Sequence, residues 1–194
     1  GLGPISIEDT KQFVGDGYKK LVERSLMAYG DKELTHYKEA LDVYNEVFKD
    51  CCLYKVEAYE GIPQLLDFLK EHGILATVLS NKPHQRALEN VAHVFGDHTF
   101  DKVYGEREAL GIRKKPAPDG VVALIEELGL EKEDCLYLGD TNTDMETGQA
   151  AQVDTVGVTW GFRPREELEA FTPKLVADSP FQVIDYIKAV NHIE

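Results

Sequence analysis

The sequence predicts an α/β fold, in which a mostly parallel sheet is covered by helices on both faces and preceded by a small helical unit. Up to about Tyr59 every apolar pattern is helical, whereas from Gly61 onward strand-sized apolar runs alternate with amphipathic helices. Short connections between alternating strands and helices are typical of parallel sheets. We therefore expect residues 1–58 to form the helical unit and residues 59–194 to form the α/β core.

The helical unit is expected to contain three helices, at residues 7–14, 18–30 and 35–50. Ser6 followed three residues later by Asp9 resembles a capping box that opens the first helix. The stretch Gly15-Asp16-Gly17 separates the first helix from the second. Apolar residues in the second and third helices recur at steps of three and four, which indicates one buried face each.

The core is expected to alternate between helices and strands. Helices are predicted at residues 63–73, 82–95, 117–129, 143–151 and 181–190, and strands at residues 74–81, 100–105, 135–140, 154–161 and 174–178. In sheets of this kind, ligands bind beyond the carboxyl ends of the strands. Those ends are where functional side chains are expected.

Composition excludes several classes of partner. The net charge of −14 argues against non-specific nucleic-acid binding, and no apolar run is long enough to cross a membrane. The three cysteines lack a CxxC pair and no secretory signal is visible, so we expect reduced thiols and a cytoplasmic protein. The sequence does not predict an oligomeric state.

Two strand ends carry groups suited to phosphate. Ser80 and Asn81 follow the run ILATVL, where a hydroxyl and the N–H groups of the next helix could bind phosphate; helix capping is the simpler alternative. Lys115 lies in RKKPAP, where flanking prolines are expected to keep the backbone extended and aim the lysine inward. The alternative for this segment is a solvated basic turn.

The third strand end is YLGDTNTD, with Asp140 directly after a strand and Asp144 at the start of a helix. Either carboxylate could cap the helix. Asp140 also suits Mg²⁺, which binds one or two carboxylates together with phosphate oxygens, and Asp144 would support it through water or a second layer of contacts.

In this order, VLSN, KKPAPDG and GDTNTD resemble the motifs of the haloacid dehalogenase superfamily, and SNKP with TVGVTWGF is most similar to its phosphoglycolate phosphatases. The resemblance covers most of the chain from Gly61 onward. It implies a Mg²⁺-dependent phosphatase of small phosphorylated metabolites that works through an aspartyl-phosphate. Ser80 and Lys115 would bind phosphate and assist catalysis, with Asn81 beside them, and Asp140 would hold Mg²⁺ with Asp144 in support.

The resemblance also implies that residues 1–58 are part of a helical cap, in which Gly15, Asp16 and Gly17 contact the substrate. The family's nucleophile lies in a DxDGT signature at the end of an N-terminal strand, and this sequence has no such signature. We therefore expect the chain to be N-terminally truncated, without its first central strand, and inactive alone. That strand would lie between the strands that end at Ser80 and Asp140, and its loss would leave two edges unpaired.

Two further functions stay open from the sequence. A non-catalytic phosphate-binding or metabolite-binding module on the same scaffold would bind ligand without turnover. A phosphomutase of the same superfamily would convert one sugar phosphate into an isomer instead of releasing free phosphate.

Overall fold

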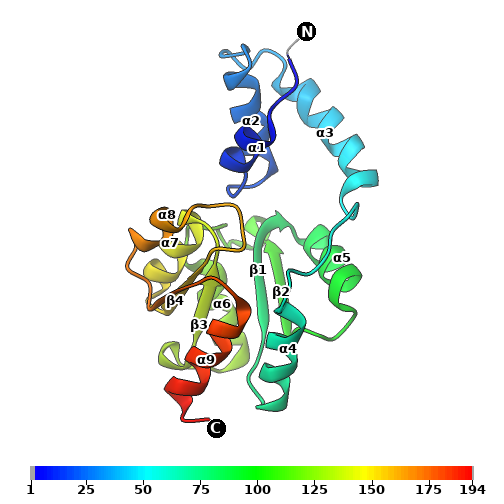
Figure 1. The fold of residues 1–194 in the computed structure, drawn as a ribbon. Helices are drawn as coiled ribbons and strands as arrows, with labels where there is room; N and C mark the ends of the chain where they lie inside the picture. The colour runs from blue at the N-terminus through cyan, green and yellow to red at the C-terminus, as the bar shows by residue number, and fades with distance from the viewer. Residues whose placement is uncertain (1–2, 194) are drawn as a thin grey trace. The chain divides into compact units, whose positions relative to one another are not determined.

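The computed structural model describes residues 3–193 of a chain that divides into two compact units, residues 1–56 and residues 57–194 (Figure 1). The first unit is helical, and the strands described in the structure all lie in the second. Among the described residues, no helix has the length and apolar character that a membrane crossing requires.

The first unit contains α1 (Ile7–Phe13), α2 (Tyr18–Ala28) and α3 (Tyr37–Cys51). The expected cap of α1 is confirmed, because the Ser6 hydroxyl accepts the Asp9 N–H at 3.0 Å. Helix α3 begins two residues later than predicted. The buried Asp31 carboxylate accepts the N–H groups of Thr35 and His36, at 2.9 and 2.8 Å, and so holds the chain in a turn before the helix.

The second unit alternates between helices and strands, as the sequence predicts. In chain order its elements are α4 (Ile62–Glu71), β1 (Thr77–Pro83), α5 (His84–Phe95), β2 (Lys102–Glu106), the 3₁₀ helix η1 (Glu108–Leu110), α6 (Asp119–Leu128), the 3₁₀ helix η2 (Lys132–Asp134), β3 (Leu136–Gly139), α7 (Asn142–Ala151), β4 (Asp154–Val158), α8 (Arg165–Glu169), β5 (Leu175–Ala177) and α9 (Pro180–Asn191).

All the strand pairs are parallel, which confirms the predicted α/β class. The strands form two separate sheets, one of β1 and β2 and one in the order β3-β4-β5. Thr77 lies opposite Lys102 in the first sheet, and Leu136 lies opposite Asp154 in the second. Within the described residues, β1 and β3 each have one edge that is not paired with another strand.

Some predicted boundaries were wrong. Strand β1 begins only at Thr77, because the chain after α4 is still bonded to the helix end: the Ile74 N–H donates to the Leu69 carbonyl at 2.8 Å. Helix α8 was not predicted. The basic segment before α6 is turned and not extended, since it contains a cis Lys115–Pro116 peptide and the Ala117 N–H donates to the Lys114 carbonyl.

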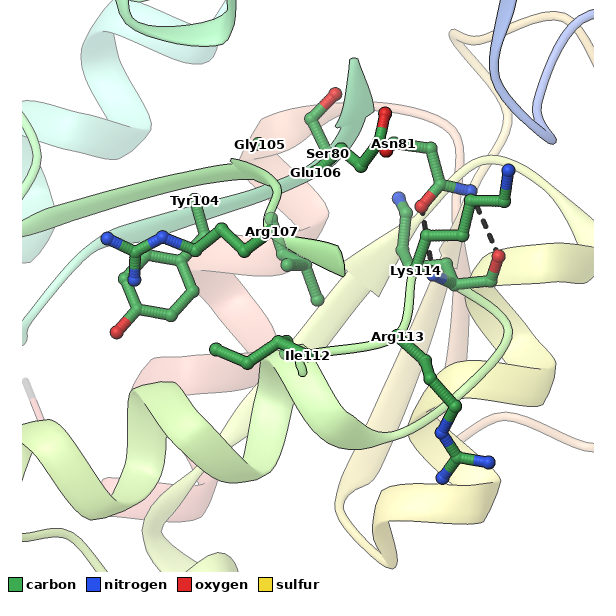
Figure 2. Close-up of a pocket in the computed structure, with 12 residues that line it drawn as sticks. Ser80, Asn81, Tyr104, Gly105, Glu106, Arg107, Ile112, Arg113 and Lys114 are labelled. Atoms are coloured by element: carbon green, nitrogen blue, oxygen red, sulfur yellow. Dashed lines mark hydrogen bonds between the residues drawn. The ribbon is translucent and has the colours of Figure 1, made fainter. Parts of the chain in front are cut away.

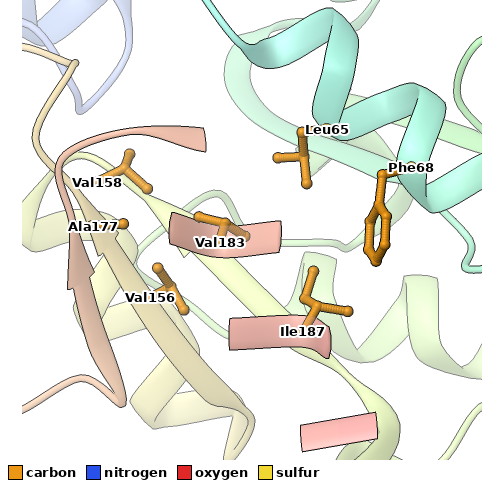
Figure 3. Close-up of a cluster of buried hydrophobic side chains, with 7 residues drawn as sticks. All are labelled: Leu65, Phe68, Val156, Val158, Ala177, Val183 and Ile187. Carbon is orange, nitrogen blue, oxygen red and sulfur yellow. The ribbon is translucent and has the colours of Figure 1, made fainter. Parts of the chain in front are cut away.

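The main hydrophobic core of the second unit joins the three-stranded sheet to α4 and α9 (Figure 3). It is formed by side chains with less than a tenth of their surface exposed: Leu65, Phe68, Val156, Val158, Ala177, Val183 and Ile187. Burial of such aliphatic and aromatic surface is the main force that holds sheet and helices together. The carboxyl ends of β1 and β3 lie outside this cluster, free to carry polar groups.

Candidate functional site

The first strand-end group is Ser80, near the end of β1. Its hydroxyl oxygen accepts the Lys82 N–H at 3.1 Å, which fixes the side chain at the start of the turn into α5. A serine hydroxyl can accept and donate at once, so this bond leaves its hydrogen for a ligand. Helix α5 has no side-chain cap from Ser80 or Asn81, because its N-cap residue is Pro83.

Asn81 is buried, with 7% of its surface exposed, and its side chain clamps the backbone of Lys115. The Lys115 N–H donates to Asn81 Oδ1 at 2.8 Å, and Asn81 Nδ2 donates to the Lys115 carbonyl at 3.0 Å. Figure 2 shows this pair of bonds as dashed lines. The amide therefore acts on the lysine main chain across 34 residues of sequence.

The Lys115 ammonium meets Asp144. The Nζ–Oδ1 distance is 2.6 Å, and both side chains are largely buried, at 13% and 6% exposed. Burial alone opposes the charged form of Lys115, yet Tyr137 and Asp144 raise its pKa above the usual value. For Asp144, burial opposes ionisation, but Lys115 and several hydrogen bonds outweigh it and lower the pKa. Both groups are therefore charged at neutral pH.

Asp144 also caps helix α7. Its Oδ2 accepts the Thr141 N–H at 3.2 Å and the Thr141 hydroxyl at 2.8 Å, and the Thr141 hydroxyl oxygen accepts the Asp144 N–H in return. The Tyr137 hydroxyl donates to Oδ1 at 3.2 Å. The carboxylate thus has donors on both oxygens, so capping and contact with the lysine are combined in one residue.

Asp140 follows β3 and is held differently. Its Oδ2 accepts the Phe162 N–H at 3.2 Å. Burial, followed by repulsion from Asp144, raises the pKa of Asp140 above its usual value. The raised pKa means that negative charge at Asp140 is incompletely compensated, which is the setting in which a bound cation is favourable.

A divalent cation fits this donor set only with further ligands. No group of three or more His, Cys, Asp or Glu side chains within residues 3–193 is arranged to hold a metal by itself. Mg²⁺ is commonly bound by one or two carboxylates completed by water and substrate phosphate. Asp140 could be one such carboxylate, while the oxygens of Asp144 are already occupied by protein donors.

A pocket lies on the β1–β2 side of the site (Figure 2). Ser80, Asn81 and Lys115 line it together with residues of β2 and of the loop before α6, whereas Asp140 and Asp144 are not part of its lining. Three cationic side chains besides Lys115 also contribute to its walls: Arg107, Arg113 and Lys114. Figure 2 shows Arg107 lying over the ring of Tyr104, 3.8 Å from its centroid.

The structure thus connects Asn81, Lys115 and Asp144 by hydrogen bonds, and Ser80 lines the same pocket as Asn81 and Lys115. Asp140 is close enough for Lys115 and Asp144 to change its pKa. Gly15, Asp16 and Gly17 lie in the first unit, in the loop between α1 and α2, where Arg24 forms an ion pair with Asp16 and donates to the Phe13 carbonyl at 3.1 Å. Their contact with a substrate stays a prediction.

Two residues of the site escaped sequence analysis. Tyr137 was treated as part of an apolar strand, although its hydroxyl reaches Asp144. Gly161 was not singled out, although a Cβ atom at this position would collide with the Asp140 side chain. The sequence offered a weak signal for Tyr137 only, since buried tyrosine hydroxyls usually find a hydrogen-bond partner.

Comparison with known proteins supports the family that the motifs resemble, and the match extends along much of the chain. Residues 1–158 match the model of the haloacid dehalogenase-like hydrolases. A phosphoglycolate phosphatase of Psychrobacter arcticus is 29% identical, with 96% of this chain and 83% of the relative covered. A 5'-nucleotidase of Pseudomonas aeruginosa is 30% identical, with coverage of 89% and 76%.

Solved structures share the fold. A candidate phosphoglycolate phosphatase of Lactobacillus delbrueckii superposes with a TM-score of 0.84 at 27% identity, over 94% of this chain and 83% of that one. A haloacid dehalogenase-like protein of Streptococcus pneumoniae gives 0.82 at 21% identity, with coverage of 95% and 83%. With its parallel strands and its sequence match, this chain belongs to the haloacid dehalogenase-like hydrolase family.

Proposed function

We propose that this chain forms the phosphate-binding and metal-binding part of a phosphatase that acts on small phosphorylated metabolites. The observation that carries the proposal is the placement of Lys115, which is clamped through its main chain by Asn81 and through its ammonium by Asp144. A lysine fixed in the loop before α6, where it lines the same pocket as Ser80, offers a phosphate both a charge and hydrogen-bond donors.

In this proposal Ser80 donates its hydroxyl hydrogen to a phosphate oxygen, and Lys115 neutralises the negative charge that phosphoryl transfer redistributes over the phosphate oxygens. Asn81 acts by positioning Lys115, because its amide is already engaged with the lysine main chain. Asp140 would be the direct protein ligand of Mg²⁺, and Asp144 would support the site by orienting Lys115. A bound Mg²⁺ would supply further compensation for the charge of the phosphate.

The reaction also needs a nucleophile, and the family resemblance gives this role to an aspartate at the end of another strand. We propose that such a strand pairs with the free edges of β1 and β3, where the two sheets of the described residues are left unjoined. The aspartate oxygen would bond to phosphorus as the ester P–O bond breaks. A second aspartate would protonate the leaving alcohol and then take a proton from the water that releases inorganic phosphate.

Two substrate classes deserve the first tests. Phosphoglycolate comes first because several relatives are phosphoglycolate phosphatases. A nucleoside monophosphate comes second because the 5'-nucleotidase relative is 30% identical over most of the chain. The three cysteines, Cys51, Cys52 and Cys135, are odd in number and contain no CxxC pair, which supports a cytoplasmic location as part of this proposal.

The test is release of inorganic phosphate from each substrate with Mg²⁺ present. The assayed protein carries this chain together with a strand that ends in a DxDGT segment, and the matched control carries Lys115→Ala. We expect turnover in the first protein and loss of most of it in the second. Activity near wild type in Lys115→Ala would contradict the role of this lysine.

A further inference from the structure

The Tyr137 side chain has its ring in an apolar cluster and its hydroxyl among the charged groups of the site. Its ring packs against the second buried cluster of the unit, which includes Val121, Ala151 and Val153. Its hydroxyl leaves that cluster and donates to Asp144 Oδ1 at 3.2 Å. A ring fixed by packing holds its hydroxyl in a defined place at a low cost in conformational entropy. Burial raises the pKa of Tyr137, so the hydroxyl remains a donor at neutral pH.

The oxygen that accepts this bond is the one that meets the lysine. Asp144 Oδ1 accepts from Lys115 Nζ at 2.6 Å and from the Tyr137 hydroxyl, whereas Oδ2 is held by Thr141. With Tyr137 present, the carboxylate is fixed on both sides and Oδ1 shares its charge between two donors. Without it, Oδ1 would have the lysine alone to hold it in orientation.

We propose that Tyr137 is a positioning residue whose hydroxyl, together with Asp144, holds the Lys115 ammonium where it can receive a phosphate. An ammonium has three N–H donors, and the contacts of Lys115 with Asp144 and with the Tyr137 hydroxyl leave one for a ligand. The importance of this positioning for phosphate rests on the proposed function, but the effect on Lys115 itself does not.

A purely structural role is the competing explanation, because the ring also fills space in the core. Tyr137→Phe separates the two, since it keeps the ring and removes only the hydroxyl. Tyr29→Phe is the matched control: the Tyr29 hydroxyl also donates to an aspartate, Asp9, at 2.7 Å, and it lies in the first unit. Unfolding followed by the fluorescence of Trp160, the single tryptophan, checks that the second unit is folded in both variants.

The first measurement is the rate at which the Lys115 ammonium protons exchange with water, read from ¹⁵N side-chain NMR of the 194-residue chain. Lys115→Met assigns the signal. We expect Tyr137→Phe to accelerate exchange about fivefold, because the loss of one net hydrogen bond of about 1 kcal/mol changes such an equilibrium by about that factor. Tyr29→Phe should leave the rate unchanged. Exchange within about twofold of wild type in Tyr137→Phe would overturn the proposal.

The second measurement is affinity for inorganic phosphate in the wild type, Tyr137→Phe, Lys115→Met and the double variant. Action through Lys115 predicts about a fivefold loss in Tyr137→Phe and no further loss once Lys115 is removed. Equal losses in both backgrounds would refute action through the lysine. If the wild type binds no phosphate, the proposed phosphate site fails, and the exchange rates still decide the role of Tyr137.

Discussion

Asn81→Ala tests the clamp on Lys115 most sharply. The substitution removes two hydrogen bonds, of 2.8 and 3.0 Å, and leaves the N–H and the carbonyl of Lys115 without these partners. Each such bond contributes about 1 kcal/mol net, and more where the abandoned group stays buried. Lys115 as a whole is a partly exposed residue. We therefore expect the second unit to lose about 2 kcal/mol of unfolding free energy.

The assay is urea unfolding followed by the fluorescence of Trp160, which reports on the second unit only. With a slope of about 2 kcal/mol per molar urea, the midpoint should fall by about 1 M. Asn90→Ala is the matched control, because Asn90 Nδ2 makes a local bond to the Arg86 carbonyl at 2.9 Å within helix α5. Its loss should cost less than about 1 kcal/mol. Equal midpoints for the Asn81 and Asn90 variants would refute the clamp.

Three further predictions concern the charged groups and the close packing around them. Lys115→Met should lower the free energy of unfolding by about 3 kcal/mol, because it leaves the Asp144 carboxylate buried without its cation. In urea unfolding, adding Asp144→Asn should restore part of this loss. A double variant whose loss equals the sum of the two single losses would contradict the pairing. Asp140 has a raised pKa, so the stability available with its carboxyl protonated is complete below the unfolded pKa and is lost as the pH rises through the higher folded pKa. Thermal unfolding should therefore show that Asp140→Asn is more stable than wild type at pH 7, and that this difference shrinks toward pH 4. Mg²⁺ should not stabilise the variant. A variant less stable than wild type at pH 7 would contradict the assignment. Gly161→Ala should displace the Asp140 side chain at a cost of about 1–3 kcal/mol and weaken stabilisation by Mg²⁺ in the same assay, whereas an undiminished Mg²⁺ effect would show that Asp140 is free to move.

The sequence was most informative where structure depends on neighbours along the chain. The cap at Ser6 was predicted from residues three positions apart, and the order of helices and strands followed from local apolar periodicity. Two of the three expected strand-end groups, Ser80 and Asp140, were found in the same way, whereas Lys115 lies in the loop before α6 and not at the end of β2.

The contacts within the site could not be read in this way. Asn81 and Lys115 are 34 positions apart, and no local pattern indicates that an asparagine amide will face a distant main chain. Gly161 matters because folding brings it against Asp140, and a collision of that kind exists only in three dimensions. Capping and function were weighed as alternatives for Asp144, whereas the folded chain uses one carboxylate for the cap and for the lysine.

Hydrolysis of phosphoglycolate in the presence of Mg²⁺ tests the central claim most directly. The 194-residue chain is assayed by itself and joined to a strand that carries the DxDGT aspartates. We predict no turnover above background for the chain alone, because no aspartate among its described residues ends a strand between β1 and β3. The joined protein should release inorganic phosphate. Robust hydrolysis by the chain alone, or none by the joined protein with any small phosphate ester, would contradict the account.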